Sequence, residues 1–265
     1  MSGTAGGHGA RGDLNAGRWL RRFQQNPGAP VRLVCLPHAG GSASYFRAWS
    51  AALGDRVDLV AVQYPGRQDR IGEEPLNAMD AMADALVPLL RPLLDRPVAI
   101  FGHSMGSAIA YEVALRMEQR FGLCFSTLFA SGRKPPHTAD KEAAYLRGDE
   151  AILESMAELR ALDPAIMHDK DLYDLVMPSI RADYRLIETY RPTRPPRVSA
   201  PLLAFFGGSD KGVDAASANR WDELTTDFRG IREFPGGHFY PDECLSELVA
   251  EIARHLETRP SHLEN

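Results

Sequence analysis

A serine between two glycines is the residue of this chain best placed to do chemistry. The segment 102–106 reads Gly-His-Ser-Met-Gly; an apolar, β-prone run at 98–101 precedes it, and small residues typical of a helix follow it. In this context the serine lies on a strained turn, which exposes its hydroxyl at the end of a sheet. The glycines allow strand and helix to approach closely, and the start of the helix directs backbone N–H groups at the same point. The segment therefore predicts that Ser104 is a nucleophile.

Two later segments supply the partners that such a serine needs. A serine hydroxyl is a weak nucleophile until a base takes its proton, and an acid must orient that base. The apolar run 202–206 ends in a Gly-Gly-Ser turn followed by Asp210, and the run 231–234 ends in a Pro-Gly-Gly turn followed by His238. The order Ser, Asp, His is that of the α/β-hydrolases. Because each residue follows a strand, we predict a triad of Ser104, His238 and Asp210.

Two points in this assignment have alternatives. Asp214 is close enough in sequence to compete with Asp210 for the acid role, and Asp210 could instead cap a helix that begins near Val213. Most other histidines lack a glycine turn after a strand. His103 lies inside the serine segment, but its position next to Ser104 should direct its ring away from the hydroxyl.

The oxyanion of a tetrahedral intermediate requires preorganised donors, and removing one typically costs about 10²–10³ in rate. One predicted donor is the backbone N–H of Met105, directly after the nucleophile. The other is expected from the Pro-His-Ala-Gly-Gly loop at 37–41, which follows the first strong apolar run; the N–H of Ala39 is the candidate. A simple turn is the alternative for this loop.

The elements that must position these groups are visible as alternating patterns. Apolar runs typical of buried parallel strands occupy 31–36, 57–62, 98–101, 123–130 and 202–206, with a weaker run at 231–234. Helical patterns lie at 45–53, 76–94, 105–120, 215–226 and 242–257. This alternation predicts an α/β-hydrolase fold, with a mostly parallel central sheet and helices on both faces.

One segment interrupts the alternation. Residues 133–200 contain no convincing strand but show helical patterns at 142–160 and 171–190. We expect a helical lid over the end of the sheet where ligands bind, with extra packing helices as the alternative. The predicted organisation is listed in chain order: a flexible tail at 1–17, the first part of the core at 18–132, the insertion at 133–200, the second part of the core at 201–258 and a flexible tail at 259–265.

Length and composition limit the kinds of protein this can be. The chain has 265 residues, 44% of them hydrophobic, which fits one α/β domain with a small insertion. Its net charge of −5 gives no general attraction to nucleic acid. No apolar run is long enough to cross a membrane, and the N-terminal residues lack the apolar core of a secretion signal. We therefore expect a cytoplasmic protein that binds neither nucleic acid nor membranes.

The cysteines point to the same compartment. Cys35, Cys124 and Cys244 are odd in number and far apart in sequence. This pattern indicates free thiols, mostly buried, in a reducing environment. No spacing of Cys and His residues indicates a metal site.

Two weaker signals in the insertion concern recognition. The first is a basic stretch near its end, which could dock an acidic partner or simply be solvated; it comprises Arg185, Arg191, Arg194 and Arg197. The second is a set of methionines that could line a deformable channel or merely pack; it comprises Met156, Met167 and Met177.

Five segments together resemble the stand-alone, type II thioesterases that accompany modular polyketide synthases and nonribosomal peptide synthetases. They are 36–41, 64–67, 102–106, 206–210 and 235–239, and the similarity extends over about 19–256. The combination of the loop at 37–41 with the Tyr-Pro-Gly-Arg segment at 64–67 is specific to this group among hydrolases. Many members carry a proline soon after the acidic residue of the triad, where this chain has Lys211-Gly212.

The resemblance implies hydrolysis of acyl thioesters on the phosphopantetheine arm of acyl or peptidyl carrier proteins, which would clear aberrant or stalled acyl groups from an assembly line. The enzyme would need no cofactor of its own, because the substrate carries the phosphopantetheine, and we expect a monomer. The alternatives are a general carboxylesterase or acyltransferase on the same fold, or a binding protein that has kept the hydrolase scaffold without catalysis.

Overall fold

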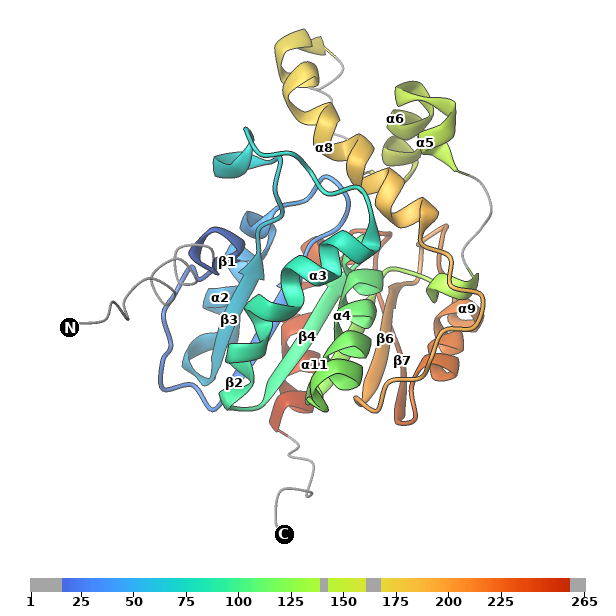
Figure 1. Cartoon of the computed structure of the whole chain (residues 1–265). Helices are drawn as coiled ribbons and strands as arrows, with labels where there is room; N and C mark the ends of the chain where they lie inside the picture. Colours follow the sequence, from blue (N-terminus) through green and yellow to red (C-terminus); the bar gives the residue numbers. More distant parts are fainter. Residues whose placement is uncertain (1–15, 139–142, 161–167, 258–265) are drawn as a thin grey trace, which may run out of the picture.

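A computed structural model of the chain describes residues 16–138, 143–160 and 168–257; within them one sheet lies between two layers of helices (Figure 1). The seven strands of these ranges follow the order β1-β3-β2-β4-β5-β6-β7. Only the β1–β3 pair is antiparallel among the strand pairs described. The strands are β1 (Leu20–Arg21), β2 (Val31–Leu36), β3 (Val57–Val62), β4 (Val98–His103), β5 (Thr127–Ser131), β6 (Leu202–Gly207) and β7 (Phe228–Phe234). The predicted α/β-hydrolase sheet is confirmed.

Two layers of helices bury the apolar side chains of this sheet. Helices α3 (Met79–Leu90) and α4 (Met105–Phe121) cover one face, and α2 (Arg47–Leu53) and α11 (Leu245–Glu257) cover the other (Figure 1). Alternate residues of β2, β3 and β4 enter one layer or the other, since successive side chains of a strand point to opposite faces. Burial on both faces explains why these strands read as unbroken apolar runs.

Two strands begin at other residues than predicted, and a further strand, β1, was not predicted. The run at 123–130 becomes a strand only from Thr127, because the end of α4 takes up its first residues: Gly122 is left-handed, and the N–H of Leu123 donates to the Met117 carbonyl at 3.4 Å. The strand predicted at 231–234 begins earlier, at Phe228; it is the edge strand and is mostly exposed, so its apolar pattern is weak. Strand β1 has two residues, too few for a periodic signal.

The insertion between β5 and β6 is helical in its described residues. Helices α5 (Ala144–Arg147), α6 (Asp149–Glu158) and α8 (Lys170–Thr189) lie beyond the end of the sheet at which β4 leads into α4 (Figure 1). They share a small apolar cluster of their own. Its buried members are Ala144, Ala151, Ile152, Leu153, Met156, Met177, Ile180 and Tyr184, and Ala39 from the core packs against it. The predicted tails lie mainly outside the described residues, at 1–15 and 258–265.

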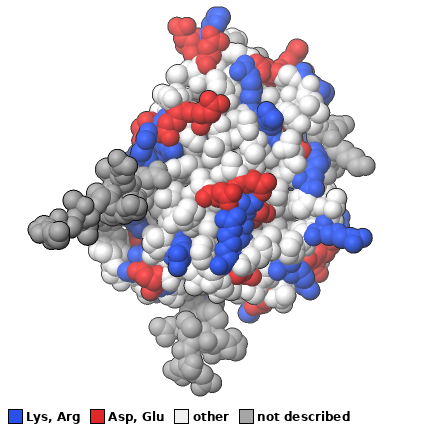
Figure 2. Space-filling view, in the orientation of Figure 1, with Lys and Arg blue, Asp and Glu red and all other residues white. Residues whose placement is uncertain are grey.

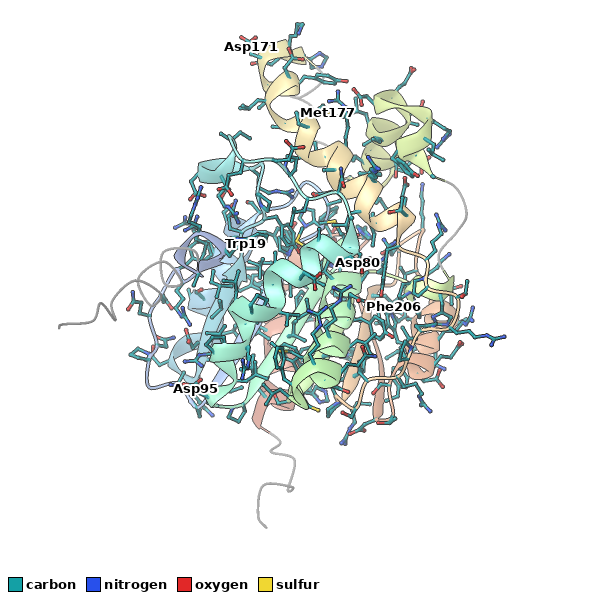
Figure 3. All side chains as sticks on the ribbon, in the orientation of Figure 1. Trp19, Asp80, Asp95, Asp171, Met177 and Phe206 are labelled. Carbon is teal, nitrogen blue, oxygen red and sulfur yellow. The ribbon has the colours of Figure 1, made fainter. Side chains whose placement is uncertain are left out.

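The surface carries charges of both signs. Figure 2 shows acidic and basic side chains intermingled on the face that carries α3 and α4. There Arg116 of α4 pairs with Asp80, Asp84 and Glu112, and Figure 3 labels Asp80 beside α3. Such an arrangement provides no broad basic surface on this face for a nucleic-acid backbone.

Three features concern membranes, metals and thiols. Within the described ranges, no helix has the length and apolar character needed to cross a bilayer. No cluster of three or more His, Cys, Asp or Glu side chains in the same residues could hold a metal ion. The three cysteines are free thiols: Cys35 and Cys244 are buried, whereas Cys124 is exposed.

Candidate active site

Ser104 lies at the junction between β4 and α4, in a backbone conformation that few residues adopt. Its φ and ψ are 52° and −116°, and its N–H donates to the Ser131 carbonyl at 2.7 Å. Such a conformation costs on the order of 1–3 kcal/mol and persists only where the surroundings enforce it. The strained turn predicted from the serine segment is therefore present at Ser104.

The two glycines of this turn are required by close backbone packing. A Cβ atom on Gly102 would lie 2.1 Å from the carbonyl oxygen of Gly106. A Cβ atom on Gly106 would lie 2.2 Å from the carbonyl oxygen of Leu36. Strand β2 and the start of α4 thus approach so closely that any side chain at these positions would force the backbone apart.

Asp210 and His238 form a hydrogen-bonded pair at the ends of β6 and β7. His238 Nδ1 lies 2.8 Å from Asp210 Oδ2, and the Asp210 side chain is fully buried. The second carboxylate oxygen, Oδ1, accepts from the N–H of Gly212 at 2.8 Å. The two turns pack tightly, since a Cβ atom on Gly207 would lie 2.1 Å from the Gly237 carbonyl oxygen. The hydrogen bond at Nδ1 and the packing of the two turns together hold the imidazole ring of His238 in a fixed orientation.

Asp214, the alternative acid, has a different role in the fold. It caps helix α9 (Ala215–Asn219), where its Oδ1 accepts from the hydroxyl of Ser217 at 2.6 Å and from the N–H of Ser217 at 2.8 Å, and its own N–H donates to Ser217 Oγ at 3.0 Å. These hydrogen bonds from Ser217 lower the pKa of the Asp214 carboxyl. The helix that Asp210 could have capped is therefore capped by Asp214, and the carboxylate of Asp210 is left for His238.

Four of the predicted groups line one cavity of about 230 Å³, and Asp210 is joined to them through its hydrogen bond to His238. Ser104, Met105, Ala39 and His238 all line it. Within the described residues the Ser104 hydroxyl makes no hydrogen bond to His238, as is common for catalytic pairs before a substrate is bound. The residues that follow β4, β6 and β7 therefore lie close together at this cavity.

The backbone donors predicted for the oxyanion are also at this cavity. The N–H of Gly40 is already engaged, because it donates to Asp183 Oδ2 at 2.8 Å. Among the described residues, no acceptor lies within hydrogen-bond reach of the N–H groups of Ala39 and Met105. Both remain available to a ligand.

Two further histidines lie beside His238, and burial keeps both neutral. His103 is fully buried, with Nδ1 2.9 Å from Ser131 Oγ and its ring centroid 5.2 Å from that of His238. Burial is the main reason why the pKa of His103 lies well below 6.5, and the charge of His238 lowers it further. Burial, with the charges of His238 and Arg67, lowers the pKa of His38 to about 3. The expectation that the ring of His103 turns away from the serine agrees with its bond to Ser131.

The buried His103 makes stability sensitive to acid. Below pH 6.5 the unfolded chain gains a proton at this residue that the folded chain does not bind. Stability therefore falls as the pH decreases, with a slope of up to about 1.4 kcal/mol per pH unit from this one group. Urea unfolding at pH 7 and pH 5 should show the loss, and His103→Asn should make the dependence shallower. The exposed His168 provides the matched control, His168→Gln, which should leave the slope unchanged. Equal slopes for wild type and His103→Asn would contradict the assignment.

The methionines of the insertion have different surroundings. Met156 lines the cavity. Met177 is buried in the insertion's own apolar cluster, and Figure 3 places it along α8 between the core and the outer tip marked by Asp171. Met167 lies outside the described residues. Of the two methionines that the structure describes, Met156 lines the cavity and Met177 does not.

The basic stretch is not a single surface. Arg191 lines the cavity, whereas Arg185 and Arg194 are exposed. Arg197 is held by the protein itself, since it donates to the carbonyls of Thr225 at 2.6 Å and Asp222 at 3.1 Å. Arg197 therefore has a structural role in joining the end of the insertion to the core.

Sequence reasoning did not find Asp183, although it is one of the most constrained polar groups near the cavity. Its carboxylate pairs with both terminal nitrogens of Arg67, at 2.7 and 2.9 Å. The available signal was a charged residue among apolar positions of an amphipathic helix: α8 buries Ile180, Tyr184 and Ile187 on the same side.

Comparison with known proteins gives a consistent match over the core. The model of the family described as "Thioesterase domain" matches residues 31–259. The probable cadicidin biosynthesis thioesterase of Streptomyces griseus is 40% identical over 246 residues, which cover 92% of this chain and 67% of that protein. Thioesterase PikA5 of Streptomyces venezuelae is 37% identical over 245 residues, which cover 92% of this chain and 87% of that protein.

A solved structure agrees in fold as well as in sequence. The type II thioesterase BorB from the borrelidin biosynthetic cluster is 42% identical and superposes with a TM-score of 0.80. The match covers 90% of this chain and 98% of that one. The similarity thus includes the central sheet and most of the segment between β5 and β6.

Proposed function

The chain belongs to the thioesterase family, and from this premise we propose that it hydrolyses acyl thioesters held on the phosphopantetheine arm of carrier proteins. The names of its relatives refer to a thioesterase of cadicidin biosynthesis and to a type II thioesterase of the borrelidin biosynthetic cluster. The substrates would therefore be acyl or peptidyl carrier proteins of a polyketide or nonribosomal peptide assembly line. The reaction would release aberrant or stalled acyl groups from them.

The observation that carries this proposal is the meeting of a strained serine and a carboxylate-held histidine in one cavity. His238 accepts the proton of the Ser104 hydroxyl as Ser104 Oγ attacks the thioester carbonyl carbon. Asp210 accepts a hydrogen bond from Nδ1–H of His238 and so keeps Nε2 available as the base. The N–H groups of Ala39 and Met105 stabilise the oxyanion that forms on the carbonyl oxygen.

Collapse of this intermediate breaks the carbon–sulfur bond, and His238 gives the proton that it took from Ser104 to the departing sulfur, so that the phosphopantetheine thiol is released and His238 is again neutral. Thiolates leave readily, so protonation of the leaving group matters less than in amide cleavage. A water molecule then gives its proton to His238 and attacks the acyl-serine, and the free acid departs as Ser104 regains its proton. The arm reaches the enzyme already attached to the carrier protein, and the chemistry requires no other cofactor.

The insertion helices shape the place where the acyl group would lie. The insertion contributes Met156, Leu159, Tyr184 and Ile187 to the lining of the cavity that Ser104 also lines, together with the polar Ser155, Glu188 and Arg191. The apolar part of this lining suits the acyl chain and excludes water during acyl transfer. We propose that the insertion serves as a lid in this sense.

A matched pair of substrates tests the proposal. The same short acyl group is presented on a phosphopantetheinylated carrier protein and as a simple oxoester, and release of the free acid is measured for each. We expect a higher kcat/KM on the carrier-bound thioester. A higher value on the oxoester would favour a general carboxylesterase, and transfer to an added alcohol or amine instead of water would favour an acyltransferase. If a fluorophosphonate probe failed to label the protein, a binding protein without catalysis would be the better description.

A further inference from the structure

We propose that Asp183, on insertion helix α8, is a positioning residue for hydrolysis: it holds the loop at 37–41 so that the N–H of Ala39 faces the reacting carbonyl. The proposal rests on the function proposed above, and in particular on the oxyanion role of Ala39. It links an element of the insertion directly to the chemistry in the core.

The carboxylate and its partner bind two peptide groups of the loop, the one between Ala39 and Gly40 and the one between Gly41 and Ser42. Asp183 Oδ2 accepts from the N–H of Gly40 at 2.8 Å and from Arg67 Nη1 at 2.7 Å, and Oδ1 accepts from Arg67 Nη2 at 2.9 Å. The same Nη1 donates to the carbonyl of Gly41 at 3.1 Å. One end of the loop is thus fixed through both a donor and an acceptor of its backbone.

These anchors determine the orientation of the peptide that carries the Ala39 N–H. The loop is a closed turn, because the N–H of Gly41 donates to the His38 carbonyl at 3.0 Å. Gly40 has a φ of +74°, which only a few residue types adopt without strain. With Gly40 and Gly41 held by the Asp183–Arg67 pair, rotation of the turn would break several hydrogen bonds together. Ala39 therefore keeps its N–H in the cavity before substrate arrives, which is the preorganisation that an oxyanion site requires.

Burial makes this arrangement stiff. The Asp183 side chain is 0% exposed and that of Arg67 is 6% exposed, so each charge depends on the other for compensation. A buried bidentate pair fixes two planar groups relative to each other more narrowly than an exposed pair does. Arg67 also lies 5.2 Å from the ring centroid of Tyr64, and the Tyr64 hydroxyl donates to the Pro37 carbonyl at 3.3 Å.

Apolar contacts attach the insertion to the same turn. The space beside Gly40 Cα is occupied by Ile180 and Met156, which would lie 3.5 and 3.7 Å from a Cβ atom placed there. Ala39 itself packs against the insertion's apolar cluster. The charge pair and this packing act on adjacent residues, so a displacement of α8 would move the loop that carries Ala39.

A merely structural ion pair would stabilise the fold without affecting the chemical step, and a second buried pair provides the matched control. Asp58 of β3 is 4% exposed and pairs with Arg32 and Arg22, each at 3.0 Å. It lies near the start of β3, whereas the cavity lies beyond the ends of the strands. Asp183→Asn and Asp58→Asn make the same chemical change in two buried pairs, only one of which contacts the loop.

The experiment measures steady-state kinetics on an acyl-loaded carrier protein at a temperature where circular dichroism shows each variant to be folded. We expect Asp183→Asn to lower kcat by about 10- to 100-fold with KM within about 2-fold of wild type, since part of one oxyanion donor is lost. We expect Asp58→Asn to keep kcat within about 2-fold. A boronic acid that forms a tetrahedral adduct with Ser104 should bind Asp183→Asn at least about 10-fold more weakly. A non-hydrolysable amide analogue should bind it as tightly as wild type.

The outcomes separate this inference from the proposed function. If the wild-type protein releases no acid, the proposed function fails and the role of Asp183 fails with it. If the wild type is active but Asp183→Asn keeps its kcat, changes only KM, or loses no more kcat than Asp58→Asn, the positioning role alone is overturned. If Asp183→Asn does not fold, Arg67→Lys takes its place, because a lysine can pair with Asp183 but cannot also reach the Gly41 carbonyl as the guanidinium does. We expect Arg67→Lys to lower kcat by about 3- to 10-fold, and an unchanged kcat would overturn the proposal.

Discussion

Ser104→Ala should lower kcat for acyl release from a carrier protein by at least about 10⁴-fold. The Ser104 hydroxyl is the only side chain of the proposed mechanism that forms a bond to the substrate carbon, and alanine leaves the backbone donors and the cavity in place. What remains would come from the oxyanion donors and binding alone. The assay is the release of free acid from a short acyl group on a phosphopantetheinylated carrier protein, followed over time.

A second serine near the loop at 37–41 provides the control. Ser44 hydrogen-bonds with Ser42 and Gln68, and within the described residues no hydrogen bond joins it to a histidine. Ser44→Ala should therefore leave kcat within about 2-fold of wild type. Intact-mass measurement after treatment with a fluorophosphonate should show one adduct on the wild type and on Ser44→Ala, and none on Ser104→Ala. Acid release by Ser104→Ala at the wild-type rate would contradict the assignment of the nucleophile.

The serine turn could be predicted from sequence because its cause is local. Gly102 is required by backbone atoms of its own segment, and although Gly106 also meets the Leu36 carbonyl of the neighbouring strand β2, the five-residue pattern that contains both glycines is continuous in the sequence. The same holds for Asp210 and His238, each of which follows an apolar strand and a glycine turn. The carboxyl ends of parallel strands lie at the same edge of a sheet. Residues that directly follow such strands, as Ser104, Asp210 and His238 do, are therefore expected to lie near one another.

The Asp183–Arg67 pair could not be predicted in the same way, because its cause is not local. The two residues are separated by 116 positions, and nothing in either segment identifies the other as its partner. The Tyr-Pro-Gly-Arg segment drew attention to Arg67, but only the packing of α8 against the loop shows what the guanidinium binds. The neutral state of His103 likewise depends on burial by residues from several elements.

The choice between Asp210 and Asp214 shows how a local rule can be correct and still leave two solutions. Both residues follow β6 closely, and a helix N-cap was expected for one of them. The structure uses Asp214 for the cap and turns the carboxylate of Asp210 toward His238. The lack of a side chain on Gly207 permits this outcome, because a Cβ atom there would lie 2.1 Å from the Gly237 carbonyl oxygen and would push away the segment that carries His238.

Asp210→Asn should lower kcat by about 10⁴-fold while the fold is retained. This large effect makes it the best test of the assignment of Asp210 to His238 and of Asp214 to the helix cap. The amide is the same size as the carboxylate, but its NH₂ group can present a donor to Nδ1 of His238. The imidazole would then carry its proton on Nε2, where it can no longer accept the proton of Ser104. The steady-state rate on an acyl-loaded carrier protein and the thermal unfolding midpoint should be measured together.

Asp214→Ala is expected to lower stability and leave kcat unchanged. Comparison of the two variants therefore decides which aspartate orients His238. Loss of an N-cap typically costs about 1 kcal/mol of stability, so the unfolding midpoint should fall while kcat stays within about 2-fold of wild type. A large loss of kcat in Asp214→Ala with full activity in Asp210→Asn would transfer the acid role to Asp214, and the hydrogen bond between Asp210 and His238 would then be structural. Only the expected pair of results is compatible with a buried carboxylate that acts through the tautomer of its histidine.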